Sequence, residues 1–429
     1  EQFLKKKFAK KPEVVEANIK VMHAGYNFAD TIEALPSSYT VLSANLRKGT
    51  YRNVMGNQAT AWGFLAAAER ANKELFLGSY PITPASDILH ELAKHKNLGV
   101  KTFQAEDEIA GICSAIGASF TGSLAITTTS GPGLALKGEA LGLAIMTELP
   151  LVVVDVQRGG PSTGLPTKTE QSDLFQALYG RNGESPAVIL ASSTPANCFD
   201  WSYMASKITL EHNTPVVLLS DGYLGNGAEP WNIKSTKDMP SITPNIATEG
   251  EEYLPYKRDD RTLARKLALP GTKGMEHRLG GLEKEDITGN VSYDGDNHEK
   301  MCRIREEKIN RIANIIPKQE VFGKEKGDLL VVGWGGTHGS LYSAVEKLQK
   351  EGLNISLSQF NYINPLPKNT AEILNNFKKI VVCELNNGQF VNYLRMKNQG
   401  VIFNQYNKLQ GLPFTTSELE DYFKTLLKN

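Results

Sequence analysis

Apolar strand-like runs alternate with helix-like segments along most of the chain beyond residue 50. Apolar residues three and four positions apart predict helices over residues 59–72, 85–96 and 107–120. Short continuous apolar runs predict buried strands over residues 74–79, 123–129, 149–156, 187–191 and 215–220. This alternation predicts an α/β fold with a parallel sheet that helices cover on both faces.

The alternation is interrupted over residues 230–300, where Pro, Gly and charged residues cluster with little periodicity. We expect an extended connecting arm or a subunit-contact segment there. A second, smaller α/β unit is expected from residue 328 to the end. Its predicted strands cover residues 328–335, 355–359 and 380–385, and its predicted helices cover residues 341–350 and 370–377.

Residues 1–50 follow neither pattern and predict a short helix followed by a loop, with a break at Pro36-Ser37-Ser38. The lysines of residues 4–11, LKKKFAKK, are best explained as the solvated face of a terminal helix. Because the chain opens on Glu1 and runs directly into a charged helical stretch, we expect processing or an upstream part. The expected segments are therefore 1–50, 51–230, 231–327 and 328–429.

Composition narrows the class of protein. A chain of 429 residues with 41% hydrophobic and 22% charged residues indicates a soluble globular protein of two to three domains. Lys plus Arg and Asp plus Glu both number 47, so no overall positive field favours nucleic acid or an acidic membrane surface. No apolar run approaches the roughly 18 residues of a membrane span, and we expect a cytoplasmic protein.

The sequence predicts no metal centre in this chain. Its four cysteines, Cys113, Cys198, Cys302 and Cys383, are far apart and form no CxxC pair, which argues against a local zinc or iron–sulfur framework. Two short acidic segments, Asp221-Gly222 and Asp294-Gly295-Asp296-Asn297, resemble fragments of metal loops. They lack the ligand spacing of an EF-hand.

The loop at residues 157–173, QRGGPSTGLPTKTEQSD, follows a predicted buried strand and is the first candidate for chemistry. Loops that leave the carboxyl ends of parallel strands commonly carry ligand sites. Arg158 offers a planar fork for a carboxylate, and Lys168 with nearby hydroxyls such as Thr167 suits a second anionic group. This suggests a substrate with two acidic ends, and the alternative is an ordinary surface loop.

Four further segments connect a predicted strand with a helix or open a helix. In YPITPAS, residues 80–86, Thr83 and Pro84 suit the start of a helix, and Thr83 is either a simple cap or a receiver of a carboxylate. In AEDEIAGICSAIGAS, residues 105–119, Glu106 and Glu108 lie at opposite edges of an apolar stripe. Either one complements the helix dipole or holds a cofactor ring, and periodicity does not choose between them.

Glycine-rich turns complete the set of candidate segments. TTTSGPGLALKGE, residues 127–139, predicts a strand, a Gly-Pro-Gly turn and a helix that could hold a flat cofactor or an anion. GWGGTHG, residues 333–339, is a second such turn and a weak signal alone.

These five segments, taken together and in this order, resemble the alpha subunit of 2-oxoacid:ferredoxin oxidoreductases over roughly residues 50–429. In that family thiamine diphosphate lies between an alpha chain with the pyrimidine-binding domain and a beta chain with the Mg²⁺, diphosphate and 4Fe-4S sites. The resemblance implies a pyrimidine-binding domain over 51–230 and a transketolase C-terminal-like domain over 328–429. It also implies a beta subunit, ferredoxin, coenzyme A as cosubstrate and a dimer of heterodimers.

The resemblance also assigns individual residues. It places the glutamate that binds the aminopyrimidine ring at Glu108, with Glu106 as the fallback, and it implies further cofactor contacts at Pro81, Ile82, Ser130 and Gly131. It gives the substrate's 1-carboxylate to Thr83 and Arg158. It gives the distal carboxylate of 2-oxoglutarate to Thr167 and Lys168, within a PTKTEQ pattern that pyruvate and branched-chain members do not generally keep.

The resemblance favours oxidative decarboxylation of 2-oxoglutarate to succinyl-CoA, with the reverse carboxylation also possible. Residues 1–48 look like the tail of a fused gamma domain, so the role of gamma in coenzyme A binding stays open. A pyruvate or branched-chain 2-oxoacid oxidoreductase and a non-catalytic scaffold for the beta subunit are the alternatives.

Overall fold

The computed structural model describes residues 1–33, 37, 40, 42–44 and 46–428. The described chain forms two compact units, residues 1–49 and residues 50–429. Within this part of the chain, no helix combines the length and the apolar character that crossing a bilayer requires.

The first unit consists of two helices, α1 (Gln2–Lys7) and α2 (Pro12–Thr31). The prediction of one short helix followed by a loop is therefore wrong, because α2 extends for 20 residues. Leu4, Phe8, Val14 and Ile19 are only partly exposed, whereas the lysines at positions 5–7, 10 and 11 are exposed as expected. Of the predicted break, Pro36 and Ser38 lie outside the described residues.

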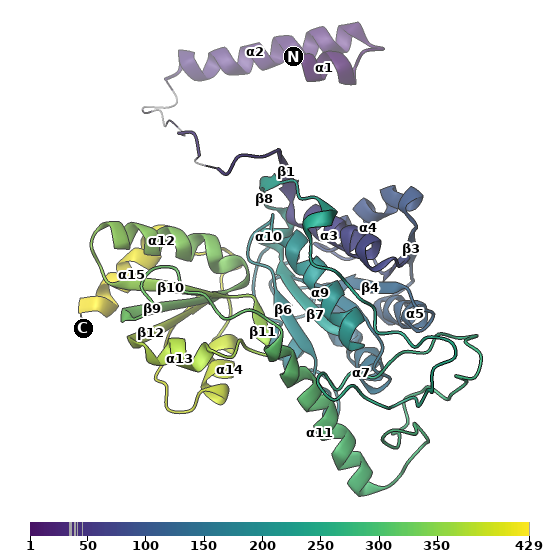
Figure 1. Ribbon diagram of the computed structural model, residues 1–429. Helices are drawn as coiled ribbons and strands as arrows, with labels where there is room; N and C mark the ends of the chain where they lie inside the picture. The colour runs from purple at the N-terminus through teal and green to yellow at the C-terminus, as the bar shows by residue number, and fades with distance from the viewer. Residues whose placement is uncertain (34–36, 38–39, 41, 45, 429) are drawn as a thin grey trace. The chain divides into compact units, whose positions relative to one another are not determined.

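The second unit is built around a seven-stranded sheet with the order β11-β6-β7-β5-β4-β2-β3 (Figure 1). All neighbouring strands are parallel except β11, which runs antiparallel to β6 at the edge. The strands are β2 (Leu75–Ser79), β3 (Val100–Gln104), β4 (Leu124–Thr129), β5 (Val152–Gln157), β6 (Val188–Ala191), β7 (Val216–Asp221) and β11 (Tyr362–Asn364). The predicted parallel α/β sheet is confirmed, although β3 and β11 were not predicted.

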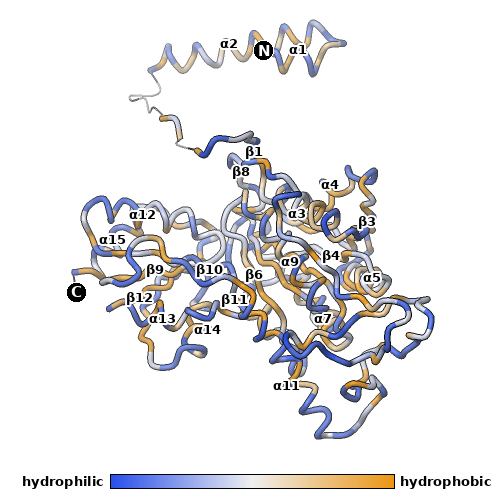
Figure 2. The backbone as a smooth tube through the Cα atoms, in the orientation of Figure 1, coloured by the Kyte–Doolittle hydropathy of each residue, from blue (hydrophilic) through white to orange (hydrophobic). Residues whose placement is uncertain are grey.

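Helices cover both faces of this sheet because successive residues of each strand point to opposite sides. On β5, Val152 and Val154 pack with α3 (Gly56–Ala71), α4 (Ser86–Leu92) and α9 (Cys198–His212). Val153 packs on the other face with α5 (Glu108–Phe120), α6 (Gly131–Leu136), α7 (Gly138–Met146) and α8 (Leu174–Tyr179). The hydrophobic colour in Figure 2 accordingly gathers along the interior strands of this sheet.

A smaller parallel sheet with the order β10-β9-β12-β13 forms the second α/β part. Its strands are β9 (Gly327–Trp334), β10 (Ile355–Phe360), β12 (Phe377–Glu384) and β13 (Asn404–Asn407). Its helices are α12 (His338–Lys350), α13 (Thr370–Asn375), α14 (Gln389–Lys397) and α15 (Thr416–Lys428). The helix predicted over 370–377 ends at Asn375, because Phe377 already pairs with Gly327 in the sheet.

The segment between the two sheets is mostly irregular but contains one long helix that was not predicted, α11 (Gly295–Arg311). The strand β8 (Ala228–Asn232), which precedes the irregular stretch, pairs with β1 (Tyr51–Met55), and α10 (Gly222–Asn226) leads into it. A buried ion network ties the segment to the large sheet: Glu148 binds Arg258 with both oxygens at 2.5 and 2.9 Å and Lys308 at 2.5 Å.

Candidate functional site

The loops that the sequence singled out leave the same edge of the large sheet. The strands β2, β4, β5 and β7 are parallel, so their carboxyl ends, Ser79, Thr129, Gln157 and Asp221, lie along one edge. Segment 80–86, turn 130–133 and loop 157–173 start at this edge. Ligands of open α/β sheets bind at such an edge.

Glu108 is the first residue of α5, and its side chain is only 9% exposed. Asp107 caps the helix by accepting a hydrogen bond from the Ala110 amide at 2.8 Å, which leaves the Glu108 side chain to face the protein. Within the described residues, the Glu108 carboxylate makes no hydrogen bond and no ion pair. Glu106 is exposed and precedes the helix, so the structure separates the two candidates clearly.

Turn 130–133 lies directly against Glu108. A Cβ on Gly133 would stand 2.7 Å from Glu108 Cγ and 2.1 Å from Thr129 Oγ1, so only glycine permits this approach. On the other side of the turn, a Cβ on Gly131 would stand 2.6 Å from an oxygen of Asp173. The turn therefore brings α5 and the end of loop 157–173 together around one short segment.

The turn also leaves polar groups unused. The hydroxyl of Ser130 is buried and has no hydrogen-bond partner within the described residues. A buried hydroxyl without a partner is costly, and a bound polar group would satisfy it. Ser130, Gly131 and Glu108 are thus suited to hold a polar ring at this turn, whereas Pro81 is exposed and Ile82 half-buried on the neighbouring segment.

Lys137 is a site residue that the sequence reasoning missed. Its side chain is fully buried, and Nζ donates a hydrogen bond of 2.7 Å to the backbone oxygen of Glu108. Burial lowers the pKa of Lys137 to about 8, although the neighbouring Glu108 opposes this shift. The lysine lies within the quoted TTTSGPGLALKGE motif, but a lysine on a helix is usually solvated, so nothing in the sequence indicated its burial.

Two buried carboxyl groups below the turn were also missed. Asp155 on β5 is fully buried, and neither carboxyl oxygen has a conventional partner among the described residues. Burial and the neighbouring Asp173 raise the pKa of Asp155, and burial raises the pKa of Asp173 to about 6. Two carboxyls in contact share a proton more readily than they ionise together. A polar residue inside an apolar strand run was the available signal.

Arg158 and Thr83 are brought together as predicted, but not as a helix cap. Arg158 is 7% exposed and donates from its terminal nitrogen to the Thr83 carbonyl at 2.6 Å. Of the two alternatives for Thr83, the helix cap is excluded, because α4 begins at Ser86 with Ala85 at the N-cap position. Ser86 Oγ closes the preceding turn by accepting from the Ile82 amide and donating to the Ile82 carbonyl. The Thr83 side chain is exposed and available.

The other end of the loop, Thr167 and Lys168, is exposed. Among the described residues, neither Arg158 nor Lys168 has an acidic side chain within ion-pair distance. The second α/β part reaches this end of the loop, since a Cβ on Gly411 would stand 2.7 Å from Lys168 Cβ. Arg158 and Lys168 thus lie at separate points of one loop, ten residues apart.

Loop 157–173 is fixed by the smaller sheet. Gln171 donates to the Trp334 carbonyl at 2.7 Å and accepts from the Leu385 amide at 3.0 Å. Gln389 donates to the Ser172 carbonyl at 2.7 Å. These bonds explain the presence of the glycine-rich turn after β9: Gly335 has φ of 57° and lies where a Cβ would meet Gln171 at 2.5 Å.

Comparisons with known proteins agree with this architecture. Residues 67–293 match the family described as pyruvate flavodoxin/ferredoxin oxidoreductase, thiamine diphosphate-binding, and residues 327–419 match pyruvate:ferredoxin oxidoreductase core domain II. The chain is 49% identical over 429 residues to the 2-oxoglutarate oxidoreductase subunit KorA of Mycobacterium tuberculosis. The alignment covers 100% of this chain and 65% of that relative, so the chain spans less than two thirds of its length.

Solved structures also show similarity to a 2-oxoacid:ferredoxin oxidoreductase. The chain is similar to the 2-oxoglutarate:ferredoxin oxidoreductase from Magnetococcus marinus with 2-oxoglutarate, coenzyme A and succinyl-CoA bound. The TM-score is 0.89 at 33% identity, over 99% of this chain and 74% of that one. A split gene transketolase, solved as an inactive beta4 tetramer, has a TM-score of 0.51 at 11% identity, over 87% of this chain and 99% of that one, and shares the fold alone.

Proposed function

The chain belongs to the 2-oxoacid:ferredoxin oxidoreductase alpha-subunit family, and from this premise we propose that it is the alpha subunit of a 2-oxoglutarate:ferredoxin oxidoreductase. The reaction converts 2-oxoglutarate and coenzyme A to succinyl-CoA and carbon dioxide, and it passes two electrons to ferredoxin. The observation that carries the proposal is Glu108, a buried and unpaired carboxylate against turn 130–133, on the sheet edge that also presents Arg158.

The residues around turn 130–133 fit the aminopyrimidine end of thiamine diphosphate. Bound there, the cofactor would supply a carbon nucleophile for the 2-oxo carbon and an acceptor for the electron pair that remains when the carboxylate leaves as carbon dioxide. Glu108 would hold a ring nitrogen and exchange a proton with it, since its carboxylate has no competing partner among the described residues. Ser130 would satisfy its buried hydroxyl on the same ring, and Lys137 would keep the start of α5 in place.

We assign the substrate's two carboxylates to two ends of loop 157–173. Arg158 and Thr83, already in contact, would bind the 1-carboxylate common to all 2-oxoacids. Thr167 and Lys168 would bind the distal carboxylate, which only a dicarboxylic 2-oxoacid has. The buried Nε of Arg158 supports this assignment, because it has no hydrogen-bond partner among the described residues and a bound carboxylate would supply one.

The remaining chemistry belongs to partner subunits. A beta subunit would supply the diphosphate and Mg²⁺ site and the 4Fe-4S cluster, ferredoxin would accept the electrons, and two heterodimers would associate. Residues 1–50 would belong to a gamma domain, and we retain the proposed division at 51–230, 231–327 and 328–429, although β11 of the last segment joins the large sheet. The cytoplasmic location stays a prediction.

A reconstitution tests the proposal directly. The chain is combined with its beta partner, and reduction of a viologen dye is measured with coenzyme A and 2-oxoglutarate, pyruvate, 2-oxobutyrate or a branched 2-oxoacid. We expect the highest kcat/KM with 2-oxoglutarate. A preference for pyruvate or a branched substrate would support the related oxidoreductases instead. Full activity of a Glu108→Ala complex would mean that this chain only positions the beta subunit.

A further inference from the structure

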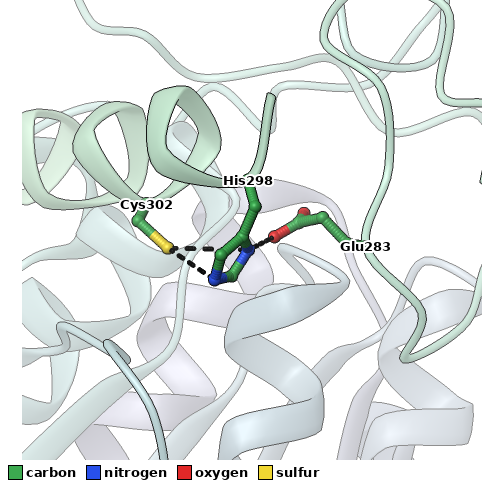
Figure 3. A group of neighbouring side chains, drawn as sticks. All are labelled: Glu283, His298 and Cys302. Carbon is green, nitrogen blue, oxygen red and sulfur yellow. Dashed lines mark hydrogen bonds and ion pairs between the residues drawn. The ribbon is translucent and has the colours of Figure 1, made fainter. Parts of the chain in front are cut away.

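A cluster of three side chains with metal-ligating atoms lies far along the chain from the candidate site. Glu283 comes from the irregular segment, and His298 and Cys302 lie one turn apart on α11 (Figure 3). Residues four apart on a helix share a face, so the two side chains meet the carboxylate on one side of α11. Nδ1 of His298 is 2.7 Å from Glu283 Oε2 and 3.9 Å from Cys302 Sγ.

These atoms form the donor set that zinc and similar metals prefer: an imidazole nitrogen, a thiolate sulfur and a carboxylate oxygen. A tetrahedral zinc ion, with bonds of roughly 2.0 to 2.3 Å, separates nitrogen from sulfur by about 3.6 Å and nitrogen from oxygen by about 3.4 Å. The observed nitrogen–sulfur separation of 3.9 Å and nitrogen–oxygen separation of 2.7 Å differ from these values by about 0.3 and 0.7 Å. All three ligand atoms lie within 4.8 Å of one another.

Arg305 supplies the outer contacts that such a site needs. Its guanidinium donates to both oxygens of Glu283 at 3.1 Å and to Cys302 Sγ at 3.2 Å. These bonds, with the one between His298 and Glu283, hold the Glu283 carboxylate in a fixed position beside Cys302. Ligating groups are commonly fixed by hydrogen bonds of this kind.

We propose that Glu283, His298 and Cys302 form a binding site for a divalent transition metal of the zinc class. The His298 side chain is 61% exposed, so a metal can enter from solvent and keep water at its fourth position. The ion would join the irregular segment to α11, a structural role that is independent of the proposed activity. The hard cations Mg²⁺ and Ca²⁺ are not expected, because they prefer oxygen ligands.

Zinc titration of the purified chain tests this site. The reduced chain is first treated with a chelator and then competes for zinc with a chromophoric chelator of known affinity. We expect one equivalent to bind with a dissociation constant on the order of 1 µM. Cys302→Ala and His298→Ala should each weaken binding at least tenfold, whereas Cys113→Ala, which removes an exposed thiol elsewhere, should bind as the unaltered chain does.

Cobalt and melting measurements distinguish the outcomes. Cobalt(II) should produce a near-ultraviolet thiolate charge-transfer band that Cys302→Ala abolishes, and zinc should raise the melting temperature of the unaltered chain but not of His298→Ala. Because His298 is largely exposed, its variant is expected to melt normally without zinc. Substoichiometric binding, equal binding by Cys302→Ala, or equal competition by Mg²⁺ would overturn the proposal, and the ion pairs of Arg305 would then account for the cluster.

Discussion

Removing the positive charge of Lys168 should change which 2-oxoacid the enzyme prefers. Under the proposed assignment, Lys168→Ala removes the cationic partner of the distal carboxylate of 2-oxoglutarate, whereas pyruvate has no group at that position. Lys168 is exposed in this chain, and its stem lies against Gly411 of the second α/β part. The variant removes the charge without disturbing a buried group, so the fold should be unaffected.

The size of the change in specificity depends on how well the contact between Lys168 and the distal carboxylate is shielded from water. An ion pair that stays in water contributes about 0.2 to 1 kcal/mol, or at most about fivefold in specificity. A charge-assisted hydrogen bond shielded from water contributes about 2 kcal/mol, or about thirtyfold. Because Gly411 already covers one side of the Lys168 stem, and a partner subunit would cover more, we expect the ratio of kcat/KM for 2-oxoglutarate over pyruvate to fall about thirtyfold.

Two comparison variants make the measurement decisive. Arg158→Ala should depress both substrates alike and leave the ratio within about twofold, because it removes the grip on the shared carboxylate. Lys237→Ala removes an exposed lysine elsewhere and should change neither kcat/KM value. The assay is viologen reduction by the reconstituted complex at constant ionic strength. An unchanged ratio in Lys168→Ala would refute the assignment of the distal carboxylate to this end of the loop.

Three further predictions address catalysis and stability. Glu108→Gln should lower turnover by roughly two to four powers of ten while the complex still assembles, and Glu106→Gln should stay within a few-fold; the reverse order would transfer the role to Glu106. Glu148→Gln leaves two buried cations without their carboxylate, so unfolding should become easier by roughly 3 to 5 kcal/mol, measured as a fall of about 5 °C in melting temperature; an unchanged melting temperature would contradict the network. Because the pKa of Asp173 is raised to about 6, its contribution to stability is complete in acid and is lost as the pH rises through 6. Asp155→Asn removes one of the two carboxyl groups that share the proton. The variant should therefore raise the melting temperature more at pH 7.5 than at pH 5, and equal shifts at both pH values would rule out a shared proton.

Most of the sheet architecture followed from the sequence because buried parallel strands have a distinctive composition. The apolar run ending at Val154 cannot be solvated on either face, so β5 was predictable to within three residues. The strand β3 was missed because only Val100 is buried in VKTFQ, and an edge strand carries little hydrophobic signal. The helix α11 was missed for a related reason, since its sequence is dominated by charged residues and only Met301, Arg305, Lys308 and Ile309 are buried.

The segments of the candidate site were predictable from the sequence because they lie in recognisable motifs. Residues whose chemistry depends on burial were not predictable in this way. Periodicity alone left Glu106 and Glu108 equivalent, but α5 begins at Glu108, so Glu106 lies two residues before the helix and does not share its face. Lys137 and Asp155 have no special feature in the sequence, and burial in the core changes their chemistry. Desolvation lowers the pKa of Lys137 and raises the pKa of Asp155, so it favours the neutral form of both. The contact between Lys137 and Glu108 joins residues 29 positions apart, and Asp155 and Asp173 are 18 positions apart. A short stretch of sequence therefore does not show either contact.

Gln171 shows how the second α/β part holds loop 157–173 in place. Arg158 and Lys168 lie ten residues apart on a loop whose middle, from Ser162 to Thr167, is mostly exposed. A loop of this length would not keep two cations at a fixed separation by itself, because ordering each residue costs about 1 to 2 kcal/mol of conformational entropy. The hydrogen bonds of Gln171 with Trp334 and Leu385 anchor the far end of the loop at the carboxyl ends of the central strands β9 and β12 of the smaller sheet. The smaller sheet would thus set the distance between the two proposed carboxylate positions. Both α/β parts together would then determine which length of substrate fits.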